Sequence, residues 1–138
     1  MLKFLVIFFV LFCNLSKALA QEKNPALIVK TQDSQLFDLQ KNRGKKVVIV
    51  IFVSWCKFCY QEMSELQKTY EKNDKNLEII AINFDEMDDE KDFLNFAKKF
   101  SFKIAKFSDI VENNFIAKPD ALPILYFVNE EGKMVKRF

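Results

Sequence analysis

Segment 46–53 constrains the fold of this chain more than any other part of it. Its residues, Lys-Val-Val-Ile-Val-Ile-Phe-Val, form a continuous run that is β-branched and apolar after the first lysine. A strand that is apolar on both faces belongs at the centre of a sheet that is covered on both sides. We therefore predict an α/β or α+β domain in which this strand is central and helices pack on the sheet.

The segments around this strand predict the remaining elements. Two short segments, 26–31 and 35–39, flank a turn-like Gln-Asp-Ser sequence and predict a β-hairpin. The following elements are then expected in order: a helix from Cys56 to Lys72, a buried strand over 77–84, a helix opened by the acidic stretch 85–92, a short connecting segment or edge strand over 101–107, and a final hairpin of 124–128 and 133–138 around a turn that contains Gly132.

The first twenty residues have the pattern of a secretory signal peptide. Lys3 supplies a positive start, 4–13 is an unbroken apolar run, and Ala18-Leu19-Ala20 offers a small-x-small cleavage site before Gln21. The apolar run is shorter than the ~20 residues that span a bilayer. We expect residues 1–20 to be a leader and the protein to be periplasmic or otherwise exported. The alternative is a domain anchored by an uncleaved leader.

The composition of the mature domain, 21–138, excludes several functions. Without Lys3 and Lys17, its 19 Lys and Arg balance its 19 Asp and Glu, so no net positive charge attracts nucleic acid or anionic lipid. The sequence has no histidine, which removes Cys–His and Ser–His–Asp catalysis and His-ligated zinc or haem. The two glycines are too few for a phosphate-binding glycine loop. We expect no cofactor and no stable membrane insertion after cleavage.

The sequence Ser-Trp-Cys-Lys-Phe-Cys at 54–59 is the candidate catalytic centre. It lies where the central strand meets the predicted helix, and a helix N-terminus stabilises a thiolate. Lys57 adds a neighbouring positive charge. We expect Cys56 to attack a partner disulfide and Cys59 to resolve the mixed disulfide. Half of a zinc site is the competing interpretation, but no further cysteine or histidine of the mature domain is available to complete it. A purely structural disulfide is the other alternative.

In this context the sequence resembles the thioredoxin superfamily, and within it the exported TlpA/ResA-like branch. The resemblance is carried by Gly44 to Val48, by 52–56 with Cys59, Glu62 and Leu66, by Ala81-Ile82-Asn83 with Asp85, and by Leu122-Pro123 followed by 124–133. It covers about Pro25 to Phe138. It implies a thioredoxin-like fold with a central mixed sheet flanked by helices, an N-terminal β-hairpin and a redox-active disulfide between Cys56 and Cys59.

The resemblance also implies roles for residues outside the Cys pair. Pro123 would be a cis-proline that faces the cysteines, and Trp55, Leu122 and Pro123 would bind substrate. Glu62 would manage protons near the dithiol, although a surface glutamate is the plainer explanation. Thioredoxin has a buried acid in the strand before the active site, where this chain has the apolar Val50.

The chain departs from the family in two further ways. The dipeptide between the cysteines lacks the common proline, so a redox potential cannot be transferred from the family. The family continues into a terminal helix, whereas this sequence stops at Phe138. We therefore expect a truncated C-terminus that exposes apolar side chains of 124–128 and of the central strands.

The function that these features predict is exported thiol–disulfide oxidoreduction. The leading hypothesis is a reductant of specific protein disulfides, of the kind used in cytochrome c maturation or related thiol maintenance, supplied with electrons by a membrane-bound donor. The alternatives are an oxidant or isomerase of secreted proteins, and a non-catalytic thioredoxin-fold binding module or copper chaperone. The reduction potential separates reductant from oxidant, and copper binding by the reduced protein tests the last alternative.

Overall fold

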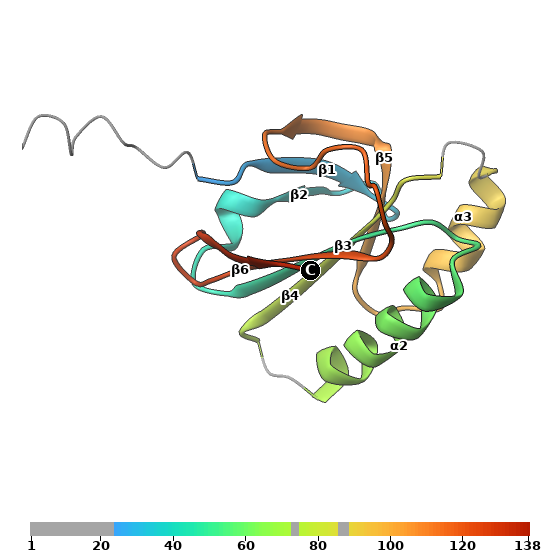
Figure 1. Cartoon of the computed structure of the whole chain (residues 1–138), viewed down its shortest axis with the longest axis horizontal. Helices are drawn as coiled ribbons and strands as arrows, with labels where there is room; N and C mark the ends of the chain where they lie inside the picture. Colours follow the sequence, from blue (N-terminus) through green and yellow to red (C-terminus); the bar gives the residue numbers. More distant parts are fainter. Residues whose placement is uncertain (1–23, 73–74, 86–88) are drawn as a thin grey trace, which may run out of the picture.

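The computed structural model describes residues 24–72, 75–85 and 89–138, and these form one seven-stranded mixed sheet with two α-helices (Figure 1). The strands lie in the order β2-β1-β5-β4-β3-β6-β7. Their bounds are β1 Leu27–Thr31, β2 Leu36–Asp38, β3 Lys46–Phe52, β4 Leu77–Asn83, β5 Lys103–Asn113, β6 Ile124–Val128 and β7 Met134–Arg137. The helices are the 3-10 helix η1 Leu39–Asn42, α2 Lys57–Lys72 and α3 Glu90–Ala97.

Strand β3 is a central strand, as its apolar run predicts. It pairs in parallel with β4 through Val48↔Ile79 and antiparallel with β6 through Ile49↔Tyr126. Every residue of β3 after Lys46 is buried. The strand therefore fixes the position of the loop that follows it, because both of its edges and both of its faces are occupied.

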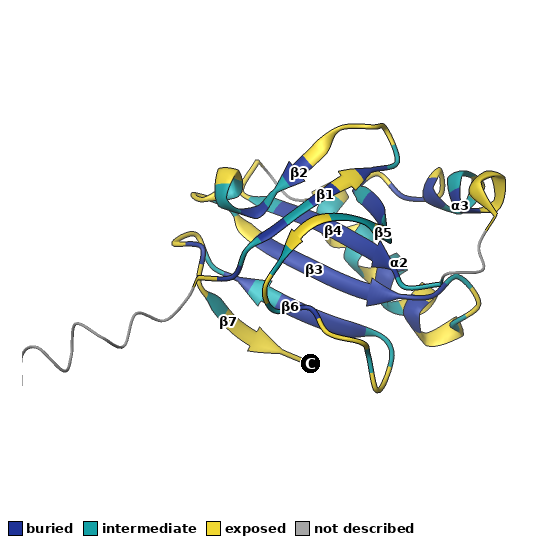
Figure 2. Ribbon diagram, turned by 90° about the horizontal axis from the view of Figure 1, so that it is seen from above, coloured by how far each residue is buried: buried dark blue, intermediate teal, exposed yellow. Residues whose placement is uncertain are grey.

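The two α-helices lie on the same face of the β3–β4 region, and the N-terminal strands cover the opposite face (Figures 1 and 2). Met63 of α2 and Phe93 of α3 share a buried cluster with Val50 of β3. On the other face, Val29 of β1 belongs to a cluster with Ile49 of β3. The sheet thus closes one side of its core with its own N-terminal hairpin.

The segment predicted to be a short connection or edge strand is in fact the long interior strand β5. Ile104 pairs with Ala81 of β4, and Ala105 pairs with both Ile82 of β4 and Thr31 of β1. The interpretation as an edge was wrong because Lys103 and Lys106 interrupt the apolar pattern. Lys103 lies inside the sheet because its ammonium group pairs with the buried Glu78 carboxylate at 2.6 Å.

The N-terminal hairpin, the two helices and the final hairpin lie where the sequence predicts them. Helix α3 begins after Asp89, whose side chain accepts a hydrogen bond from the Lys91 N–H. Residues 86–88 of the acidic stretch lie outside the described residues. Gly132 adopts φ +77° in the turn before β7, a conformation that favours glycine.

The expectation that strand 124–128 is exposed is wrong for four of its five residues. Ile124, Leu125, Tyr126 and Val128 are buried, and only Phe127 is half-buried. They are covered because alternate side chains of β6 pack into the clusters on the two faces of the sheet. The large exposed apolar side chains at this end are Val135 and Phe138. The predicted leader lies outside the described residues, and no described helix is long and apolar enough to cross a bilayer.

Candidate active site

Cys56 occupies the junction between β3 and α2. Its N–H donates to the Val53 carbonyl at 3.2 Å, and its own carbonyl accepts from the Tyr60 N–H at 3.1 Å, which is the first bond of the helix. The sequence folds this way because the apolar run ends at Val53 and helix-forming residues follow Lys57. Cys56 therefore caps the helix, in the position where the helix dipole favours a thiolate.

Cys56 and Cys59 form a disulfide across the first turn of α2. Their Cα atoms are 5.2 Å apart, and the Cys59 N–H donates to the Cys56 sulfur at 3.1 Å. Cys59 is fully buried beside Val50 and Met63, whereas Cys56 is half-buried. The sulfur with the greater access to a partner protein is that of Cys56.

Leu122 and Pro123 lie beside this disulfide although they are distant from it in sequence. The Leu122–Pro123 peptide bond is cis. The next residue, Ile124, pairs with Ile51 of β3, so the proline lies next to the end of β3 that leads to Cys56. Leu122 and Cys56 both pack against the cluster that contains Cys59.

Two large aromatic side chains are exposed in residues 54–59, the segment that contains both cysteines and is called the redox loop below. Trp55 is 76% exposed and Phe58 is 73% exposed, although each is a neighbour in sequence of a cysteine. Trp55 was identified from the sequence, but Phe58 was not. The signal for Phe58 was available, because helical spacing that buries Cys59 and Met63 turns Phe58 outward.

Glu62 lies one turn after Cys59 and lines a groove beside the redox loop. The groove has a volume of ≈ 480 Å³ and is lined by Phe58, Tyr60, Gln61, Glu62, Ser64, Glu65 and Pro123. Glu62 is half-buried, and its carboxylate has no hydrogen bond or ion pair with any residue that the structure describes. Sequence reasoning found Glu62 and Pro123 but missed the other lining residues.

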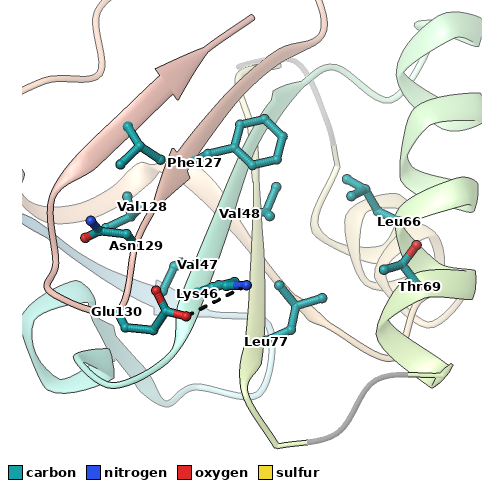
Figure 3. Close-up of a pocket in the computed structure, with 11 residues that line it drawn as sticks. Lys46, Val47, Val48, Leu66, Thr69, Leu77, Phe127, Val128, Asn129 and Glu130 are labelled. Atoms are coloured by element: carbon teal, nitrogen blue, oxygen red, sulfur yellow. Dashed lines mark ion pairs between the residues drawn. The ribbon is translucent and has the colours of Figure 1, made fainter.

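A second concavity lies at the opposite end of α2 and is almost entirely apolar (Figure 3). It has a volume of ≈ 380 Å³, and its apolar lining includes Val48, Leu66, Leu77, Phe127 and Val135. An ion pair between Lys46 and Glu130 crosses its rim. Within the described ranges, no group of three or more His, Cys, Asp or Glu side chains could hold a metal ion.

The chain has relatives whose names describe the same chemistry. The sequence profile of the Redoxin family matches residues 19–138. The thiol-disulfide oxidoreductase ResA of Bacillus thuringiensis (strain Al Hakam) is 29% identical over 129 residues, which cover 91% of this chain and 73% of ResA. The thioredoxin-like protein YneN of Bacillus subtilis (strain 168) is 28% identical over 112 residues, which cover 80% of this chain and 66% of YneN.

A solved structure with the same fold is that of StoA from Bacillus subtilis. It superposes with a TM-score of 0.62 at 18% identity, covering 82% of this chain and 86% of StoA. The fold, the disulfide at the start of α2 and the match over most of the sequence agree with one another. The chain therefore belongs to the Redoxin family of the thioredoxin superfamily and is a thiol–disulfide oxidoreductase of the TlpA/ResA-like branch.

Proposed function

We propose that this oxidoreductase is exported, is processed after Ala20, and reduces disulfides of specific proteins outside the cytosol. The thiolate of Cys56 attacks one sulfur of the substrate disulfide, and the other substrate sulfur leaves as a thiolate. The thiolate of Cys59 then displaces the substrate from Cys56 and closes the Cys56–Cys59 disulfide. Two electrons pass to the substrate, and a membrane-bound donor returns two electrons to the pair.

The unequal burial of Cys56 and Cys59 is the observation that supports this order of attack and resolution. Cys56 is the accessible sulfur at a helix N-terminus, and the buried Cys59 can react only with a disulfide already formed at Cys56. Trp55, Leu122 and Pro123 border the same place and form the substrate-binding surface. A substrate strand pairs with the backbone beside Pro123, because the proline ring leaves a free edge there.

The reduction potential of the Cys56–Cys59 pair tests the direction of electron flow. The purified protein should be equilibrated with glutathione buffers, and the oxidised fraction should be measured by mass spectrometry. A reductant should have a potential near that of thioredoxin, about −270 mV, whereas a potential near about −120 mV would indicate an oxidant.

In native cells, a Cys59→Ser variant should accumulate mixed disulfides with its substrates. A mature N-terminus at Gln21 should be found, and recovery of the full chain in the cytosol would contradict export.

We further propose that Glu62 accepts the proton that Cys59 loses during resolution. Glu62 is half-buried one turn from Cys59, and the described chain offers its carboxylate no other partner. Replacing Glu62 with Gln should slow release of the substrate and alter the pH dependence of turnover, while attack by Cys56 stays largely intact. Glu71→Gln, at the exposed far end of α2, is the matched control. Superimposable pH–rate profiles for wild type and Glu62→Gln would leave water as the acceptor.

A further inference from the structure

The groove beside the redox loop extends from the disulfide along α2. Phe58 stands at the end of the groove next to the cysteines, Pro123 forms part of its wall, and Glu65 lies two turns along the helix from Phe58. A polypeptide bound at Pro123 for reaction with Cys56 must therefore pass over or beside this groove.

The groove is negatively charged, and its carboxylates are available to a partner. Its lining contains Glu62 and Glu65 and no lysine or arginine. Glu62 has no side-chain partner in the described chain. Glu65 pairs with Lys68 at 2.6 Å, but both side chains are more than half exposed. Such a solvated pair contributes little to stability, so Glu65 can exchange Lys68 for another cation at small cost.

The groove is also bordered by apolar surface that water now covers. Phe58 lines it and is 73% exposed, and Trp55 is exposed on the other side of Cys56. Lysine and arginine side chains combine an alkyl stem with a cationic end, so they can cover an aromatic ring while their charge reaches a carboxylate. An acidic side chain in the same place would be repelled by the carboxylates of Glu62 and Glu65.

We propose that the groove selects substrates in which a lysine or arginine lies close in sequence to the cysteine that Cys56 attacks. The alkyl stem of this residue packs on Phe58, and its cation pairs with Glu62 and Glu65. The inference rests on the proposed function, since it names the class of polypeptide that the same site reduces. The site therefore recognises a positive charge and an apolar stem in the substrate segment next to the substrate disulfide.

Synthetic peptides test this selectivity. Each peptide contains one cysteine in a disulfide with a chromophoric thiol, and the set places Lys, Gln or Glu at each position within a few residues of that cysteine. The reduced full chain transfers two electrons to this disulfide and releases the peptide thiol and the chromophore. Each rate is divided by the rate with dithiothreitol, because a cation in the peptide also accelerates exchange with an ordinary thiol.

At the best position, the second-order rate constant of the reduced protein with the Lys peptide should exceed that with the Glu peptide by about fivefold at low salt, the size expected for partly solvated ion pairs. Glu65→Gln should reduce this ratio, and Glu62→Gln combined with Glu65→Gln should bring it close to one. The control Glu71→Gln, on the same helix but outside the groove lining, should keep the wild-type ratio.

Two results would overturn the inference: equal normalised rates for Lys and Glu peptides at every position, or a wild-type preference that survives in the double variant. Both are ratios between peptides, so a general loss of rate at Glu62 does not affect them. If no peptide is reduced by the wild-type dithiol although dithiothreitol reduces all of them, the proposed reductase function itself fails.

Discussion

Cys56 and Cys59 differ in exposure although one helical turn separates them. Alkylation of the reduced protein at about pH 7 should modify Cys56 well before Cys59, because the helix N-terminus favours the Cys56 thiolate and the Cys59 sulfur is buried. Mass spectrometry of peptides after a short exposure to iodoacetamide measures the order. Equal or reversed labelling would contradict the assignment of Cys56 as the nucleophile.

Asp33, in the turn between β1 and β2, links the stability of the hairpin to pH. The Thr31 hydroxyl donates to its carboxylate at 2.5 Å, and this bond lowers the pKa of Asp33 below the ordinary 3.8. A lowered pKa stabilises the folded hairpin above the unfolded value of 3.8, and this contribution is lost as pH falls through the lowered folded value.

Replacing Thr31 with Val should raise the pKa of Asp33 towards 3.8, because the hydroxyl donor is removed while the shape of the side chain is kept. An NMR titration of the Asp33 carboxyl carbon in both proteins measures the change. As an internal control for the fold, the Asp120 carboxyl resonance at one fixed neutral pH should be the same in both proteins, since Asp120 lies far along the chain and pairs with Arg137. An unchanged Asp33 curve would show that the hydroxyl is not the cause.

The three neighbouring strands β3, β4 and β5 are joined at one place by a buried carboxylate. Glu78 of β4 pairs with Lys103 of β5 at 2.6 Å and with Lys45, which precedes β3, at 3.5 Å. Its side chain is only 7% exposed, and the two lysines supply the opposite charge that a buried carboxylate requires. Glu78 thereby helps to hold β5 in register next to β4.

Replacing Glu78 with Gln should lower the free energy of unfolding by about 1–2 kcal/mol, less than a fully buried pair because both lysines reach solvent. Urea unfolding of the oxidised protein measures this loss. Glu130→Gln is the control, since Glu130 pairs with Lys46 in solvent and should change stability by less than about 0.5 kcal/mol. Equal effects of the two variants would contradict the special role of Glu78.

Elements with strong local patterns could be predicted from the sequence, and β5 could not. The apolar run of β3 and the helical spacing of Cys59 and Met63 are local signals, and the structure confirms both elements. Strand β5 depends on distant partners, because Lys103 becomes compatible with an interior strand only when Glu78 is beside it. A single sequence does not show that pairing.

In the active site, too, one part could be predicted from the sequence and another part could not. The Cys pair is a local motif, so its position at the start of α2 follows from the strand and helix predictions. The groove was missed because it forms only when the outward face of α2 meets Pro123, which arrives from the distant start of β6. Glu65 and Phe58 have the spacing of ordinary surface residues until that contact is known.

At the scale of the whole molecule, the concavity between α2 and the β6–β7 edge leaves a group of apolar side chains open to solvent (Figure 3). Exposed apolar patches promote association and bind hydrophobic dyes. The folded protein should therefore increase the fluorescence of anilinonaphthalene sulfonate under native conditions. Val135→Thr, at the lining of the concavity, should reduce this signal.

Val111→Thr provides the matched control for dye binding. Val111 of β5 is 70% exposed and Val135 of β7 is 61% exposed, but only Val135 is in the lining of the concavity. Val111→Thr should leave the fluorescence unchanged. Equal effects of both substitutions, or no dye binding by the wild type, would show that the concavity is closed in solution.

The placement of Pro123 at the start of β6 has a consequence for biosynthesis. During translation, Cys56 and Cys59 emerge long before β6, and β6 completes the site only after it has paired with β3. For that interval the chain has its reactive thiols but lacks the surface that selects substrates. The order of synthesis thus creates an interval in which the two thiols can react without the selectivity of the completed site.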